Sequence, residues 1–162
     1  MEIAMAAVFD CEIQARLRDV NLGGHVDNVE AIRVVDEARV LFFRYAMLPG
    51  TGDSHPGLLG GLPITVSELV GAQRVDYHAE MRYAAYQPFL VRLWVSHVGR
   101  TSFSVSSEMR VAPGHEPALV AETSLVLWDQ SLDCAWAITD ALRAVMERYR
   151  DEPVALRRRP QG

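Results

Sequence analysis

The 162-residue sequence predicts an α+β fold in which a curved antiparallel sheet of about five strands surrounds one apolar helix. Three observations support this class. An unusually apolar helical segment covers residues 29–47, four long strand patterns follow it, and turn signals separate those strands. Long sequential strands favour antiparallel pairing, and a helix that is apolar on most sides needs a sheet around it.

The first predicted strand covers residues 8–18, where polar and apolar residues alternate imperfectly. A loop rich in Asn and Gly follows, and Asp27 or Asn28 is a suitable N-cap for the long helix. This helix is expected to end near Met47, before Pro49-Gly50. Its predicted stripe comprises Ala31, Val34, Val35, Ala38, Leu41, Phe42 and Tyr45, widened by Val29, Ile32, Val40 and Phe43.

The second half of the chain is predicted to be mostly strands. A Gly- and Pro-rich loop, suited to act as a flap, covers residues 49–62. Strands follow at 64–83, 89–98, 103–111 and 117–128, the first with a bulge near Ser67-Glu68. Thr139 or Asp140 caps a short helix ending at Tyr149. We expect a single domain over residues 1–162, with a core of about 8–150 and a flexible basic tail over 151–162.

Composition excludes several classes of function. The chain is 49% apolar and 23% charged, which is typical of a globular protein, and its net charge of −5 argues against nucleic acid as a partner. No apolar run reaches the roughly 18 residues that cross a membrane. The N-terminus lacks the basic region of a signal peptide, and Cys11 and Cys134 have no metal-type spacing, so we expect a cytoplasmic protein. The absence of lysine excludes lysine Schiff-base chemistry.

The segment from Asp19 to Asn28 concentrates chemically useful groups at the start of the helix. It holds two carboxylates, two carboxamides and the His25 imidazole, and Gly23-Gly24 lets the backbone approach a ligand closely. Amides at a helix N-terminus can stabilise a developing oxyanion, and those of residues 26–28 are the preferred donors. A polarised carbonyl beside a carboxylate is what acyl transfer requires.

Four motifs occur in order: Asp19 to Asn28, Glu37-Ala38-Arg39, Asp76-Tyr77 and Gly99-Arg-Thr-Ser102. With them, residues 8–150 resemble a hotdog-fold acyl-CoA thioesterase of the 4-hydroxybenzoyl-CoA thioesterase-like family. The resemblance implies hydrolysis of an acyl thioester, either acyl-CoA or acyl-carrier protein, to free acid and thiol. It also implies a homodimer or homotetramer with sites at the subunit interface, and no cofactor except coenzyme A as part of the substrate.

The resemblance leaves the acting carboxylate open. In a gapless alignment the family's carboxylate falls on Asn21, and the first Asn of its Asn-Asn pair becomes Asp27. Plant acyl-carrier-protein thioesterases, which this region also resembles, use Asp-Val-Asn-x-His. That resemblance makes Asp19 the carboxylate, oriented by Asn21 and assisted by His25. The predicted catalytic set is therefore Asp19, Asn21, His25, Asp27 and Asn28, with Asp27 as a plain N-cap the simpler interpretation.

The resemblance also implies substrate contacts. Gly24 and Val26 would lie beside the thioester carbonyl. Arg100 would bind a phosphate of the coenzyme A nucleotide, while Thr101 and Ser102 would contact its pantetheine arm.

Other interpretations remain. A surface pair with Arg33 accounts for Glu37, although hotdog enzymes of another branch use a helix glutamate as the base. The neutral side chain of Asn21 motivates a non-catalytic protein that binds acyl thioesters. An enoyl-thioester hydratase on the same fold is a third possibility.

Overall fold

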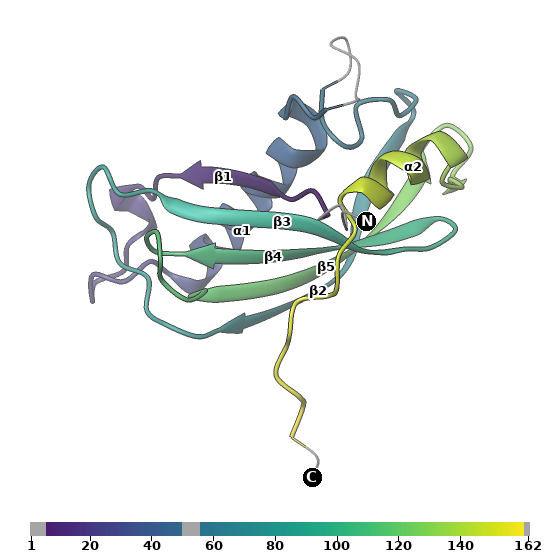
Figure 1. The fold of residues 1–162 in the computed structure, drawn as a ribbon. Helices are drawn as coiled ribbons and strands as arrows, with labels where there is room; N and C mark the ends of the chain where they lie inside the picture. Colours follow the sequence, from purple (N-terminus) through teal and green to yellow (C-terminus); the bar gives the residue numbers. More distant parts are fainter. Residues whose placement is uncertain (1–5, 50–55, 161–162) are drawn as a thin grey trace, which may run out of the picture.

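An antiparallel sheet curls round one long helix in the computed structural model (Figure 1). The structure describes residues 6–49 and 56–160, so the predictions for the N-terminal residues 1–5, the middle of the flap loop and residues 161–162 lie outside the described residues. The strand order is β1 (Phe9–Ile13), β3 (Phe89–Val98), β4 (Ser102–Arg110), β5 (Leu119–Asp129) and β2 (Val66–Tyr77), and β6 (Cys134–Ala135) pairs with β5. The predicted fold class is confirmed.

The alternation of apolar and polar side chains along a strand decides which of its two faces packs against the helix. On β4, Phe103, Val105 and Met109 are almost fully buried against the helix, as their two-residue period predicts. The predicted bulge exists in β2, but the register shifts between Val70 and Ala72, not at Ser67-Glu68. The bulged residue is Gly71, which has no side chain to place on either face.

Helix α1 (Asn28–Val40) continues into a π-helical turn, η2 (Leu41–Tyr45). The Ala46 amide donates to the Leu41 carbonyl at 2.8 Å, a bond across five residues that adds one residue to the turn. The predicted stripe is therefore wrong at its end, because Phe43 is fully buried and Tyr45 is 67% exposed. The helix also ends at Tyr45, two residues before the predicted Met47.

Aromatic packing fixes the second half of this helix against the sheet. Phe42 stacks on Phe9 of β1 with ring centroids 5.1 Å apart and meets Tyr149 edge-on at 5.3 Å. Phe43 packs on Phe103 at 5.6 Å. Burying each such ring contributes about 2–3 kcal/mol. On the outer side of the helix, Val29 and Val40 remain exposed, so the described chain covers α1 less completely than predicted.

The last turn of the helix is closed by residues 57–59, in the second half of the predicted flap loop. The amides of Gly57, Leu58 and Leu59 donate to the carbonyls of Ala46, Phe42 and Phe43 at 2.7–3.0 Å. These bonds satisfy carbonyls that a helix end leaves without partners.

The two ends of the core differ from their predicted bounds for local reasons. Strand β1 stops at Ile13 instead of residue 18, because Leu17–Asp19 form a 3₁₀ turn, η1, capped by the Asp19 carboxylate. Helix α2 (Asp140–Arg148) begins after Thr139, whose hydroxyl accepts from the Leu142 amide, so the predicted cap is confirmed. None of the helices in the described residues is long and apolar enough to cross a membrane.

Candidate functional site

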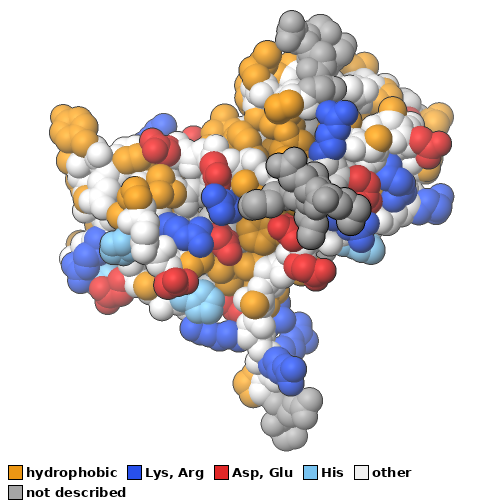
Figure 2. All heavy atoms as spheres, in the orientation of Figure 1, with side chains coloured by type: hydrophobic (Ala, Val, Ile, Leu, Met, Phe, Trp, Pro, Cys, Tyr) orange, Lys and Arg blue, Asp and Glu red, His pale blue; other side chains and the backbone are white. Residues whose placement is uncertain are grey.

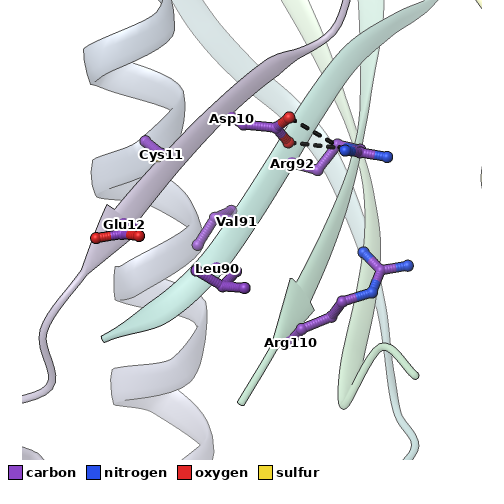
Figure 3. Close-up of a pocket in the computed structure, with 7 residues that line it drawn as sticks. All are labelled: Asp10, Cys11, Glu12, Leu90, Val91, Arg92 and Arg110. Carbon is purple, nitrogen blue, oxygen red and sulfur yellow. Dashed lines mark hydrogen bonds and ion pairs between the residues drawn. The ribbon is translucent and has the colours of Figure 1, made fainter. Parts of the chain in front are cut away.

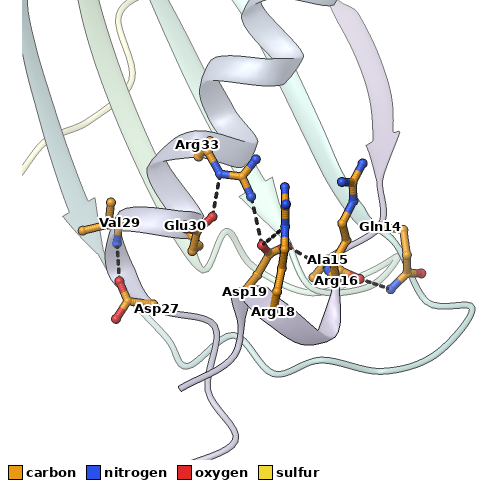
Figure 4. A network of polar contacts seen from close by, with 9 residues as sticks. All are labelled: Gln14, Ala15, Arg16, Arg18, Asp19, Asp27, Val29, Glu30 and Arg33. Carbon is orange, nitrogen blue, oxygen red and sulfur yellow. Dashed lines mark hydrogen bonds and ion pairs between the residues drawn. The ribbon is translucent and has the colours of Figure 1, made fainter. Parts of the chain in front are cut away.

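The side chain of Asp27 caps the first turn of α1. One carboxylate oxygen, Oδ1, accepts from the Val29 amide at 2.9 Å, which confirms the predicted N-cap (Figure 4). Within the described residues, the second oxygen, Oδ2, accepts no hydrogen bond. Asp27 is half-buried, so this oxygen can meet a ligand at the mouth of the helix.

Two of the three amides predicted as oxyanion donors are already occupied. The Val26 amide donates to the Met81 carbonyl at 2.7 Å, and the Asp27 amide donates to the Asp19 carbonyl at 3.0 Å. Contacts with distant segments use these donors, so the prediction is wrong for both. Among the described residues, the Asn28 amide has no acceptor. It is the donor that remains beside Asp27 Oδ2 at the positive end of the helix dipole.

The surroundings of Asp19 are those of a residue that stabilises the fold. It is only 3% exposed, and its two oxygens accept from the Arg16 amide at 2.8 Å and the Arg33 guanidinium at 2.9 Å (Figure 4). Arg33 also pairs with Glu30 at 2.5 Å. The predicted Arg33–Glu37 pair is therefore wrong, because Arg33 binds the buried carboxylate that precedes the helix.

Asn21 shapes the loop with its own side chain. Its Oδ1 accepts from the amides of Gly23 and His25 at 3.0 and 3.2 Å. Gly24 follows with a φ of +80°, a conformation in which a side chain would be strained. The Asn21 carboxamide thus stabilises the turn that leads into the helix.

His25 lies on the surface between two charged side chains. Its Nδ1 is 3.6 Å from a Glu80 oxygen, and its Nε2 is 3.3 Å from the Arg82 guanidinium. Because a guanidinium only donates, Nε2 accepts and the ring proton lies on Nδ1, towards Glu80. This cluster borders the loop of Asn21 and lies outside the helix cap.

Tyr77 is a site residue to which the sequence analysis gave no role. Its hydroxyl donates to the Asn28 carbonyl at 3.0 Å and so joins the end of β2 to the start of α1. Burial raises the pKa of the Tyr77 hydroxyl, the bond to Asn28 partly offsets this, and the nearby Asp27 carboxylate raises it further. The Asp76-Tyr77 motif, already noted in the sequence, was the signal for this contact.

The predicted nucleotide contacts lie elsewhere in the chain. Arg100, Thr101 and Ser102 form the turn between β3 and β4, at the opposite end of the sheet from the segment that leads into α1 (Figure 1). The Arg100 side chain is exposed. One chain therefore brings Asp27, Asn28 and Tyr77 together but leaves this turn apart from them.

Asp27, Asn28 and Tyr77 line none of four cavities that are formed by other described residues. The largest, about 590 Å³, lies where β1 meets β3, with Asp10 paired to Arg92 at its rim (Figure 3). Burial, then Asp10 and Glu37, raise the pKa of the Cys11 thiol in this cavity to about 11, which keeps it protonated. A second cavity of about 310 Å³ lies between β1 and α1 and reaches Asp19 and Glu37.

No metal centre accompanies these residues. In residues 6–49 and 56–160, no three His, Cys, Asp or Glu side chains are close enough together to hold a metal ion.

A comparison with known protein families identifies the superfamily of this chain. The sequence model of the thioesterase-like superfamily matches residues 15–147, and the chain belongs to this superfamily. Its matched segment includes the whole Asp19 to Asn28 region and the Asp76-Tyr77 motif. Among curated protein sequences there is no match.

Solved structures share the fold at low sequence identity. A predicted thioesterase from Bacillus stearothermophilus is 18% identical with a TM-score of 0.69, over 91% of this chain and 99% of that one. A thioesterase from Thermus thermophilus, complexed with coenzyme A and Zn, is 19% identical with a TM-score of 0.63, over 85% and 90%. A 1,4-dihydroxy-2-naphthoyl-CoA thioesterase from Synechocystis is 16% identical with a TM-score of 0.68, over 86% and 96%. These similarities establish a shared hotdog fold.

Proposed function

We propose that this protein hydrolyses an acyl-CoA thioester to the free acid and coenzyme A, in the manner of the 4-hydroxybenzoyl-CoA thioesterase-like family. Membership of the thioesterase-like superfamily and the coenzyme A bound by the Thermus thermophilus neighbour support this substrate class. The observation that carries the proposal is that Asp27 Oδ2 and the Asn28 amide, in neighbouring residues at the mouth of α1, have no hydrogen-bond partner in the described residues.

These two groups suit the two halves of the reaction. The Asn28 amide would hold the carbonyl oxygen as it gains negative charge, aided by the helix dipole. Asp27 would take a proton from a water whose oxygen forms the new bond to the carbonyl carbon. The carbon–sulfur bond then breaks, and the proton on Asp27 passes to the leaving thiolate.

Asp27 is a better base than Asp19 in this arrangement. The carboxylate of Asp19 is buried, and both of its oxygens already accept hydrogen bonds, from Arg16 and Arg33, whereas Asp27 Oδ2 accepts none in the described residues. Asp19 instead positions the loop, because its carbonyl accepts from the Asp27 amide. Asn21 and His25 act in the same supporting way.

We propose a homodimer formed by edge strand β2. This 12-residue strand pairs only with β5 in the described chain, and Leu69 and Val70 are about half exposed, at 46% and 51%. Unpaired edges of this kind recruit other strands. Antiparallel pairing of β2 with its copy would bring the partner's β3–β4 turn to the end that holds Asp27.

The direct test is hydrolysis by the purified protein. Short, long and aromatic acyl-CoA thioesters would be incubated with the protein, and the released thiol measured. Turnover that disappears in Asp27→Asn is expected. No turnover of any of the three classes would contradict the proposal.

A second function follows from Asn21, which replaces the family's carboxylate. A protein that binds acyl-CoA without cleaving it would show a raised melting temperature with these ligands and no released thiol. That pair of results would select the binding protein over the hydrolase.

A further inference from the structure

After helix α2, residues 149–157 cross the outer face of the sheet, and we call this segment the C-terminal strap. It begins at the edge of β3, where the Val95 amide donates to the Tyr149 carbonyl at 2.8 Å and the Asp151 amide donates back to the Val95 carbonyl at 3.0 Å. It then passes over β3, β4, β5 and β2 and continues beyond the β2 edge (Figure 1).

Each step of the crossing is fixed by a hydrogen bond. The Trp94 indole donates to the Glu152 carbonyl at 2.8 Å, and the Val154 amide donates to the Ser106 hydroxyl at 3.0 Å. At β2, the Arg157 amide donates to an Asp76 oxygen at 2.5 Å. The strap accounts for the burial of outward-facing Trp94 and Ser106, 8% and 0% exposed. A segment held at three strands presents its end at a defined place.

The end of the strap is strongly basic in an otherwise acidic protein. Arg157, Arg158 and Arg159 follow one another and are all exposed, while the chain as a whole carries a net charge of −5 (Figure 2). In the described residues, none of the three guanidinium groups pairs with a carboxylate. The Arg157 guanidinium instead donates to His78 Nδ1 at 3.2 Å, so the proton of the neutral ring lies on Nε2. The three arginines therefore offer guanidinium donors that no carboxylate of the described chain occupies.

The position of these arginines relates them to the helix cap. The strap is bonded to Asp76, and the next residue, Tyr77, bonds to Asn28. Asp76 and Tyr77 point to opposite faces of β2, so the arginines lie on the outer face of the same strand end whose inner face holds the cap. The strap lies outside the segment that the superfamily model matches, which ends at residue 147.

We propose that Arg157, Arg158 and Arg159 bind the phosphate groups of the coenzyme A half of the substrate. This rests on the function proposed above, and it names the part of the chain that recognises the nucleotide. Arginine forks match phosphate oxygens in geometry as well as charge, and a fixed strap loses little freedom on binding. Two acidic side chains at this end are engaged elsewhere, because Asp76 accepts a backbone amide and Glu80 lies beside His25 and Arg82.

The test measures binding of coenzyme A itself, so it does not depend on hydrolysis. Titration calorimetry would compare the wild type with R158Q/R159Q, whose altered side chains make no described contact, and with R157Q/R158Q/R159Q. The substitution at Arg157 keeps the backbone bond to Asp76. We expect Kd for coenzyme A to rise about tenfold or more in the triple variant, and its dependence on salt to flatten. Pantetheine, which lacks the nucleotide phosphates, should bind wild type and variants equally.

Arg92→Gln is the matched control. This arginine lies on the same outer face but is already paired with Asp10, so its loss should leave coenzyme A binding unchanged. Unchanged coenzyme A binding in both tail variants would overturn the proposal. So would weaker binding in Arg100→Gln alone, which would place the nucleotide at the partner's turn. If wild type binds coenzyme A but cleaves no thioester, the hydrolase fails while the strap is still tested.

Discussion

The hydroxyl of Tyr77 donates a 3.0 Å hydrogen bond to the carbonyl of Asn28, and this contact ties the last residue of β2 to the first residue of α1. The same residue, Asn28, carries an amide that has no acceptor in the described chain. An edge strand, which a partner subunit can extend, is thus coupled directly to the groups proposed to act on the thioester.

Removing this hydroxyl tests the coupling. Tyr77→Phe should lower the free energy of unfolding by about 1 kcal/mol, because it deletes one hydrogen bond and leaves a carbonyl partly unsatisfied. It should also reduce kcat more than it changes KM, since the Asn28 amide is then less well fixed. Urea unfolding and steady-state kinetics measure the two effects. A variant with unchanged kcat would show that the contact serves stability alone.

Asp27→Asn separates the cap from the chemistry. Asn is as good an N-cap as Asp, so stability should change little, while loss of the base should lower kcat roughly 10²–10⁴-fold. Thermal unfolding and thiol release measure the two quantities on one sample. Full activity in this variant would remove Asp27 from the mechanism.

Asp19→Ala should give the reverse pattern. The Arg16 amide loses its acceptor and Arg33 keeps only Glu30 as a partner, so the free energy of unfolding should fall by about 1–3 kcal/mol. Because Arg33 is partly exposed, this loss stays below the full cost of breaking a buried ion pair. Arg33→Gln, at the exposed end of the pair, should cost less. A larger loss of kcat than in Asp27→Asn would instead identify Asp19 as the acting carboxylate.

A charge on β2 tests the proposed dimer. Val70→Glu places a carboxylate on the exposed edge strand, where it should prevent pairing with a second copy. Sedimentation should then show monomers and activity should fall. Leu17→Glu alters an apolar residue in η1 that is even more exposed than Val70, and it should leave the assembly intact. If the assemblies of Val70→Glu and wild type have equal masses in solution, the interface does not lie on β2.

The two cysteines should differ in reactivity. At pH 8 the exposed Cys134 should react first with a thiol reagent, because Cys11 is shielded and its pKa is raised to about 11. The raised pKa favours the neutral thiol in the folded state. Burying the neutral Cys11 thiol therefore stabilises the folded state fully below pH 9.0, the ordinary pKa of a cysteine. This stabilisation is lost as the pH rises from 9.0 to about 11, because the unfolded chain then releases the proton more readily than the folded one. Mass spectrometry of labelled protein and unfolding of Cys11→Ala at pH 8 and 10 measure both effects.

Local patterns were sufficient to predict several elements. The bounds of β3 agree with the predicted 89–98, and the caps at Asp27 and Thr139 are where short polar side chains precede helices. These features depend on neighbouring residues in the sequence. They are therefore visible without knowledge of the rest of the fold.

Features that depend on distant contacts were missed. Helical spacing suggested Glu37 as the partner of Arg33, but Asp19, 14 residues away, binds it because both lie where the chain enters the helix. In the same way, the carbonyls of Asp19 and Met81 take two amides that a helix end would otherwise leave open. The π turn at Leu41 is equally hidden, because a regular helical period places Tyr45 on the buried side.

The bond between the Gly57 amide and the Ala46 carbonyl has a consequence for how this protein can vary. Gly57 adopts a φ of +85°, and a β-carbon there would lie 2.2 Å from the Phe43 carbonyl oxygen, so this re-entry point admits only glycine. The chain between residues 46 and 57 is therefore a closed loop anchored at both ends. Doubling the length of such a loop costs only about 0.6 kcal/mol. An insertion after Leu48, which belongs to the core, can therefore lengthen this segment at little cost while the anchor at Gly57 is kept.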